Sequence, residues 1–292
     1  MRPSQLSTDP NLWDGTCSDG TSQSPIDIDF DASIYNSNLT QTPIEFYNYD
    51  VPIRVTIVND ASLNLVMMNL ETTVNVPFIN GSGLEDVYIF DHLHFHWGNT
   101  SANGAEHLLN NWRGAGEIHS VHRNSKYTDI SEAIKYTDGL AAFAYILTEV
   151  DDSDDSAVSF SPITEALQLI STPVSTPISV RLTSLNKYFG NYKQADQVFY
   201  RYYGSSTTPT CGEMILWTVY KEPIPVTKAT LDEFRTQLYF SDGTQMVDNV
   251  RPVQATNNRT IYTNFNNSNS ASAMKINLLS FCLVILTIAL ML

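Results

Sequence analysis

Short apolar runs separated by turns follow one another without a break from about residue 13 to residue 253. This pattern limits the possible folds more than any other feature of the chain, because apolar runs bounded by turn residues predict strands. Although 292 residues exceed the usual size of one domain, a large β-rich protein can still form a single domain. Six of the predicted strands are 51–58, 63–68, 92–97, 140–150, 178–185 and 214–220.

Helical periodicity is rarer and predicts only short helices. Segments 129–136 and 162–170 are short and amphipathic, and segment 230–240 opens with a capping box formed by Thr230 and Glu233. We therefore predict a mainly β chain with peripheral helices (α+β). Its predicted parts are an N-terminal arm (1–12), a folded domain (13–254), an Asn- and Ser-rich linker (255–270) and a C-terminal apolar tail (271–292).

The charge of the chain excludes one broad class of partner. The 16 Lys and Arg residues face 31 Asp and Glu residues, which gives a net charge of −15. Nucleic acids and heparin-like polyanions are bound by clustered basic side chains, and no basic run is present. We therefore expect no nucleic-acid partner.

All six histidines lie between residues 92 and 122. On a strand, His94 and His96 share one face with His92, and a neighbouring antiparallel strand containing His119 can bring a third imidazole opposite them. Three imidazoles around one cation leave a coordination position open, which is the arrangement of a catalytic zinc site. An isolated His-x-His pair is more often an ordinary hydrogen-bonded pair. The crowding of every histidine beside Glu106 and Glu117 favours the metal site, because a ligating imidazole needs a carboxylate partner.

Several features predict passage through the secretory pathway. Residues 278–292 are almost purely apolar but would span only roughly 22 Å as a helix, less than the hydrocarbon core of about 30 Å. Small polar residues precede them, which predicts a cleaved GPI signal; the alternative is a short tail-anchor helix. A GPI signal acts only in a protein that enters the secretory pathway, and the N-terminus shows no apolar signal region, so we expect that a signal peptide has been lost from it. Five glycosylation sequons agree with this route: Asn38, Asn80, Asn99, Asn258 and Asn266.

A set of ordered motifs resembles the α-class carbonic anhydrases, in particular the extracellular GPI-anchored type. The motifs span roughly residues 13–254, so chance agreement is negligible. The resemblance implies one domain built on a large, mostly antiparallel twisted sheet, with zinc in a conical cleft. The motifs are QSPIDI (23–28), LHFHWG (93–98), EHLLN (106–110), EIHSVH (117–122), DGLAAFAY (138–145), GSSTTPTC (204–211), LWTVYKEPI (216–224) and RPVQ (251–254).

The resemblance also implies an activity, the reversible hydration of carbon dioxide to bicarbonate by a zinc-bound hydroxide. By their positions in the motifs, Thr207 would accept a hydrogen bond from this hydroxide, and Glu106 would accept the proton of the threonine hydroxyl. Glu117 would support the third ligand, and His107 and His122 would be structural. The implied zinc ligands are His94, His96 and His119, and the implied substrate pocket contains Val121, Ala142, Thr208, Ile215 and Trp217.

The resemblance further implies a disulfide between Cys17 and Cys211, with free buried thiols as the alternative. The bond would close a loop of about 194 residues and would stabilise the fold by roughly 4–5 kcal/mol. Because Cys211 lies near Thr207, reduction should also loosen the active-site turn.

Three departures from the family pattern affect the expected activity. Ser62 occupies the position of the usual proton-shuttle histidine, which predicts slow proton export. His92 replaces the usual glutamine behind His94, where an imidazole nitrogen could accept a hydrogen bond. Ser206 replaces the usual leucine before Thr207 and should make this wall of the pocket smaller and more polar.

Two functions are compatible with these observations. The first is a zinc hydro-lyase on the outer cell surface, held by a lipid anchor and acting on carbon dioxide and bicarbonate. The second is a non-catalytic carbonic-anhydrase-like ectodomain used for binding or adhesion. Such relatives usually lack a zinc histidine, whereas all three are present here.

Overall fold

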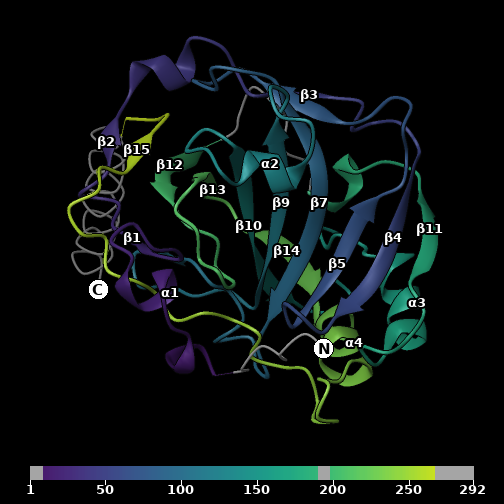
Figure 1. The fold of residues 1–292 in the computed structure, drawn as a ribbon. Coiled ribbons are helices and arrows are strands. Elements are labelled where there is room, and N and C mark those ends of the chain that lie inside the picture. The colour runs from purple at the N-terminus through teal and green to yellow at the C-terminus, as the bar shows by residue number, and fades with distance from the viewer. Residues whose placement is uncertain (1–8, 190–197, 267–292) are drawn as a thin grey trace, which may run out of the picture.

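The computed structural model describes residues 9–189 and 198–266. One 13-stranded sheet dominates these residues, with strands in the order β11-β4-β5-β7-β9-β10-β13-β12-β15-β2 and with β14, β3 and β6 joined at the sides. Figure 1 shows the strands crossing the middle of the molecule as a twisted sheet, with α1, α3 and α4 at its margins. A separate pair is formed by β1 and β8. The predicted class, mainly β with peripheral helices, is confirmed.

The strands are short at the edges and long in the centre. Most pairs are antiparallel, whereas β10 runs parallel to both β13 and β14, and β15 runs parallel to β2. The sheet is therefore mixed. The strands are β1 (Asp27–Ile28), β2 (Ile34–Tyr35), β3 (Glu45–Tyr47), β4 (Ile53–Asp60), β5 (Leu65–Leu70), β6 (Phe78–Asn80), β7 (Tyr88–Trp97), β8 (Leu108–Leu109), β9 (Gly116–Asn124), β10 (Leu140–Val150), β11 (Ile178–Leu182), β12 (Phe199–Gly204), β13 (Ile215–Tyr220), β14 (Ile224–Thr227) and β15 (Tyr262–Thr263).

The helices within the described residues are short. The α-helices are α1 (Thr16–Asp19), α2 (Ile130–Ala133), α3 (Ile163–Leu167) and α4 (Lys228–Gln237), and the 3-10 turns are η1 (Pro10–Leu12), η2 (Ser37–Thr40), η3 (Gln168–Ile170) and η4 (Asn186–Tyr188). The predicted capping box at Thr230 and Glu233 is wrong. The N-cap of helix α4 lies three residues earlier, at Thr227, whose hydroxyl accepts a hydrogen bond from the backbone N–H of Thr230.

Two apolar cores lie on the two faces of the sheet. Alternate residues of β10 divide between them: Phe143 and Tyr145 pack into the larger core, and Ala142 and Ala144 pack into the smaller one. Both faces of this strand are thus covered, and it reads as a continuous apolar run. The smaller core forms the wall beside the histidines.

The predicted linker begins too early in the chain. Strand β15 lies inside the segment 255–270 and pairs with β12 on one side and β2 on the other. The folded domain therefore extends at least to Thr263. The apolar tail lies outside the described residues, and no helix within the described part of the chain is long and apolar enough to cross a membrane.

Candidate active site

The register of β7 and β9 brings the histidines together. In this antiparallel pair His94 lies directly opposite His119, and His96 lies opposite Glu117. The register shifts between Phe90 and His92, which marks a bulge at Asp91. The bulge lets Phe90 face the larger core while His94 and His96 face the opposite side of the sheet.

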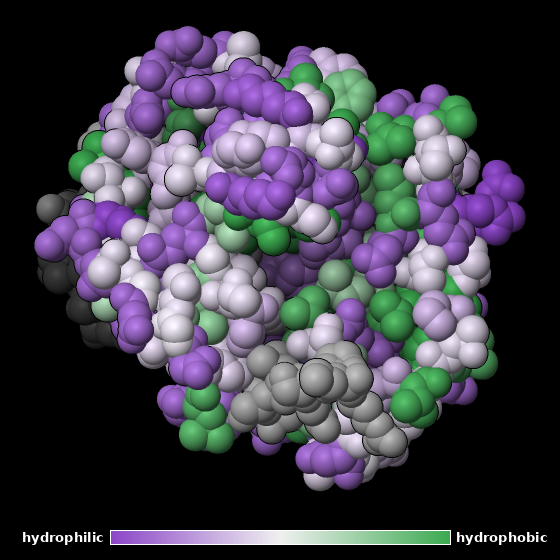
Figure 2. All heavy atoms as spheres, in the orientation of Figure 1, coloured by the Kyte–Doolittle hydropathy of each residue, from purple (hydrophilic) through white to green (hydrophobic). Residues whose placement is uncertain are grey.

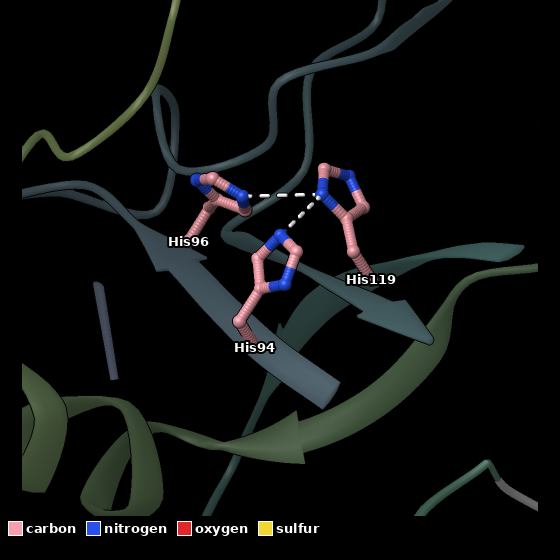
Figure 3. A group of neighbouring side chains, drawn as sticks. All are labelled: His94, His96 and His119. Atoms are coloured by element: carbon pink, nitrogen blue, oxygen red, sulfur yellow. Dashed lines mark hydrogen bonds between the residues drawn. The ribbon is translucent and has the colours of Figure 1, made fainter. Parts of the chain in front are cut away.

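Three imidazole nitrogens converge on one point, as Figure 3 shows. Nδ1 of His119 lies 3.1 Å from Nε2 of His94 and 3.2 Å from Nε2 of His96. Nitrogens bound tetrahedrally at about 2.0–2.1 Å from a zinc ion lie roughly 3.3 Å apart, so these separations fit such an ion. All three side chains are buried, with at most 8% of their surface exposed.

The surroundings keep these imidazoles neutral. Burial lowers the pKa of His94 well below its ordinary value, lowers that of His96 to about 4, and lowers that of His119 as well. Because only the neutral imidazole has a lone pair to offer, the three side chains are in the form that binds a metal.

The outward nitrogens of two ligands are held by partners that set their tautomers. Nδ1 of His96 donates to the backbone carbonyl of Asn249 at 2.8 Å. Nε2 of His119 lies 2.6 Å from Oε1 of Glu117, and the same oxygen lies 2.6 Å from Nδ1 of His107. Each outward nitrogen therefore carries its proton away from the shared centre and leaves the inward lone pair for a metal.

Glu117 is a fully buried carboxylate with four hydrogen-bond donors around it. Besides the two imidazoles, the backbone N–H groups of Glu106 and His107 donate to its Oε2 at 2.8 Å. Burial acts to raise the pKa of Glu117, but the neighbouring His107 and His119 outweigh it and hold the pKa well below its ordinary value. The second possible metal-binding group, His107, Glu117 and His119, is thus a hydrogen-bonded support of the first.

Glu106 lies beside the histidines with one oxygen held and one oxygen open. The backbone N–H of Arg251 donates to Oε1 at 2.7 Å, while Oε2 lies 3.4 Å from Nε2 of His96. Among the described residues Oε2 accepts no hydrogen bond of ordinary geometry, although the Thr207 hydroxyl lies close enough to lower the pKa of Glu106. Burial is the larger effect and raises this pKa to about 7.

An apolar wall adjoins this cluster. Val121, Ala142 and Trp217 lie side by side in register on β9, β10 and β13, and none is more than 5% exposed. The Trp217 ring lies 4.7 Å from the His119 ring, centroid to centroid. Ile215 precedes Trp217 by two residues on the same face of β13. The cluster of imidazoles is therefore bordered by an apolar surface.

A recess gives access to this face of the sheet. His96, Glu106, Thr207 and Thr208 line a cavity together with Trp13 and other side chains. Figure 2 shows a hollow over the middle of the sheet, with hydrophilic residues at its floor.

Comparison with known proteins agrees with this geometry. A family model described as eukaryotic-type carbonic anhydrase matches residues 8–265. The chain belongs to the eukaryotic-type carbonic anhydrase family. The prediction of an α-class carbonic anhydrase is therefore confirmed, and with it the predictions of a carbonate dehydratase that uses zinc.

Curated relatives support the same assignment over most of the chain. Carbonic anhydrase 4 of Mus musculus is 36% identical over 255 residues, which cover 87% of this chain and 78% of that protein. Carbonic anhydrase 4 of Rattus norvegicus is 32% identical over 262 residues, covering 89% and 81%. Carbonic anhydrase 15 of Mus musculus is 35% identical over 224 residues, covering 75% and 66%.

The expected contact between His92 and His94 is absent from this carbonic anhydrase. The two rings stack, with centroids 5.3 Å apart and planes 24° apart, so neither ring edge meets the other. Nδ1 of His92 lies 2.7 Å from Oδ2 of Asp91 instead, and Nδ1 of His94 is buried without a hydrogen-bond partner among the described residues. Asp91, the acidic residue at the bulge, thus contacts the His92 imidazole that we expected to lie behind His94.

Two serines of the carbonic anhydrase domain have local partners. Ser206 Oγ donates to the carbonyl of Thr208 at 3.0 Å and lies 3.1 Å from the Thr208 hydroxyl, so it stabilises its own turn. Exposed Ser62 lies in the turn between β4 and β5 and donates its hydroxyl to Asp60 Oδ1 at 2.6 Å.

The disulfide is confirmed and joins the N-terminal region to the active-site turn. Cys17 and Cys211 are bonded, with their Cα atoms 5.0 Å apart. Among the sequons, Asn80 differs because it is half-buried and its partner Ser82 is fully buried, with its hydroxyl donating to the carbonyl of Leu39. The other four asparagines, Asn38, Asn99, Asn258 and Asn266, are exposed.

Proposed function

We propose that this carbonic anhydrase hydrates carbon dioxide at the outer cell surface, where a C-terminal lipid anchor holds it. The Cys17–Cys211 disulfide supports this location, because such bonds persist in oxidising compartments and are rare in the cytosol. The exposed sequon asparagines are accessible to glycans. The apolar terminal sequence after small polar residues has the pattern of a GPI signal.

The substrate position follows from the wall formed by Val121, Ala142 and Trp217. Carbon dioxide is small and uncharged, and an apolar surface beside the histidines holds it without competing for the metal. A zinc ion would be held by His94, His96 and His119, and it would supply a hydroxide at neutral pH by lowering the pKa of a bound water. The apolar wall would hold carbon dioxide beside these three imidazoles.

The single observation that carries the proposed orientation is the open oxygen of Glu106. The Arg251 N–H occupies Oε1, so buried Oε2 is left as the acceptor for the nearby Thr207 hydroxyl. A threonine hydroxyl has one proton, so when it donates this proton in a hydrogen bond to Glu106 it can only accept hydrogen bonds from other groups. Thr207 would therefore accept a hydrogen bond from the attacking oxygen, and this would direct a lone pair of that oxygen toward carbon dioxide.

We expect the supply of external buffer to limit turnover. Hydration releases one proton for each bicarbonate formed, and Ser62 cannot carry a proton at neutral pH. Adding imidazole buffer should raise kcat, and Ser62→His should raise kcat at low buffer, because an imidazole can take up and release a proton at neutral pH. Stopped-flow measurement of carbon dioxide hydration at several buffer concentrations tests this, with Ser62→Ala as the control that should behave as wild type. High turnover that does not depend on buffer would show the idea to be wrong.

We expect the lipid anchor to be released enzymatically. Cells that express the full chain behind a signal peptide should carry carbonic anhydrase activity on their surface, and phosphatidylinositol-specific phospholipase C should move it into the medium. A control chain that ends after Asn266 should be secreted without the phospholipase. Surface activity that resists the phospholipase would instead support the tail-anchor helix, and activity confined to the cytosol would overturn the proposed location.

A further inference from the structure

Arg251 is a buried cation whose guanidinium is held by neutral oxygens. Only 3% of its surface is exposed, and no carboxylate contacts the guanidinium among the described residues. Neutral oxygens hold it instead. Nη1 donates to the carbonyl of Ser24 at 2.7 Å and to Oε1 of Gln23 at 2.9 Å, and Nη2 donates to the carbonyl of Cys17 at 2.7 Å. Three acceptors in a fixed fork hold the side chain in one place.

The backbone of the same residue holds Glu106. The N–H of Arg251 donates to Oε1 at 2.7 Å, across 145 residues of sequence. Because the side chain of Arg251 is anchored at its far end, the contacts of the guanidinium restrain the position of its backbone N–H. The position of Glu106 therefore depends on the N-terminal segment that contains Cys17.

Both halves of the disulfide reach Arg251. The backbone carbonyl of Cys17 accepts a hydrogen bond from the guanidinium itself. Nε2 of Gln23 donates to the carbonyl of Cys211 at 3.1 Å, and Oε1 of the same Gln23 amide accepts from Arg251. The covalent bond between the cysteines thus closes a ring of contacts around this residue.

We propose that Arg251 is a positioning residue that connects the Cys17–Cys211 disulfide to Glu106 and so keeps Oε2 aimed at Thr207. This inference rests on the proposed role of Glu106 and Thr207. Breaking either the disulfide or the guanidinium contacts would let the Arg251 N–H drift and would lower the rate of the chemical step, with little change in zinc binding.

The test measures carbon dioxide hydration, zinc content and thermal stability of Arg251→Met. At saturating imidazole buffer, where proton export no longer limits turnover, we expect kcat to fall about 10- to 100-fold with KM and zinc stoichiometry unchanged, since small misplacements of catalytic groups have effects of this size. Arg251→Lys, which keeps the charge and the stem, should lose less and serves as a second variant if Arg251→Met does not fold. Arg201→Met is the matched control, because Arg201 is equally buried at 4% but donates to Ser82 on the far face of the sheet. It should lose stability and keep its kcat.

Two double variants separate positioning from general stability. In a Glu106→Gln background, Arg251→Met should cause little further loss of kcat, because groups that act as a unit are not additive. Replacing both Cys17 and Cys211 with serine should lower kcat by the same factor as Arg251→Met, and the combination should lose no more.

These variants distinguish a failure of the role proposed for Arg251 from a failure of the role proposed for Glu106. This inference would be wrong, while the proposed function would stand, if Arg251→Met had the kcat of wild type. The same holds if the losses of kcat in Arg251→Met and Glu106→Gln were fully additive. A Glu106→Gln enzyme with normal kcat would overturn the proposed role of Glu106, and this inference with it.

Discussion

Replacing His119 with alanine should remove zinc from the protein and lower the rate of carbon dioxide hydration by more than about 1,000-fold. The two remaining nitrogens, on His94 and His96, come from one strand and cannot enclose an ion by themselves. Without the metal, the pKa of the attacking water returns from about 7 to 15.7, so almost no hydroxide is available at neutral pH. Metal analysis and stopped-flow hydration measure the two effects.

His122 provides a matched control on the same strand. It lies three residues further along β9, and its Nε2 contacts the Tyr49 hydroxyl in the larger core, on the opposite face from His119. Burial lowers the pKa of His122 to about 3, so its imidazole is neutral at pH 7. His122→Gln should lower stability while zinc content stays at one per chain. Full zinc occupancy in His119→Ala, or zinc loss in His122→Gln, would contradict the assignment of the ligands.

Loss of the disulfide should have the largest effect on stability. The bond between Cys17 and Cys211 joins residues 194 positions apart, and closing a loop of this length restricts the unfolded chain by about 5 kcal/mol. Replacing both cysteines with serine should therefore lower the free energy of unfolding by about this amount. Urea denaturation of the oxidised protein and of the double variant, followed by tryptophan fluorescence, measures the difference.

The urea midpoints of the two proteins can also contradict this prediction. Equal urea midpoints for the two proteins would show that the unfolded chain gains no freedom when the bond is removed. A phosphine reductant applied to the unmodified protein is the control, since it breaks the bond without changing the sequence. It should reproduce the midpoint of the double variant, and an unchanged midpoint after complete reduction would count against the prediction.

Some features of the fold are present in local sequence patterns, and these were predicted with good boundaries. Strand 140–150 matches β10 along its whole length, and strand 214–220 matches β13 to within one residue. Such runs are buried on both faces, so their apolar character is continuous and easily detected. Two-residue strands such as β15 were missed, because residues this few show no periodicity and gain their pairing only from neighbours already in place.

The bulge at Asp91 shows why a correctly predicted strand can still place a side chain on the wrong face of the sheet. Strict alternation along 88–97 would put Phe90 on the same face as His94 and His96. One extra residue reverses the phase, so that Phe90 packs into the larger core while the histidines face the site. The same extra residue, Asp91, contacts His92 and leaves the outward nitrogen of His94 without the expected partner.

Local patterns in the chain were sufficient to predict the strand-rich class, the family and the side chains expected to bind zinc, because spacing along a strand dictates which residues share a face and ordered motifs can be recognised from the sequence. The contacts that hold these side chains became visible only in the folded protein. The Asn249 carbonyl behind His96 and the Arg251 N–H on Glu106 are backbone groups about 150 residues away in the chain. Every residue has such groups, so no residue type marks them, and only the folding of the chain selects which of them meet the site.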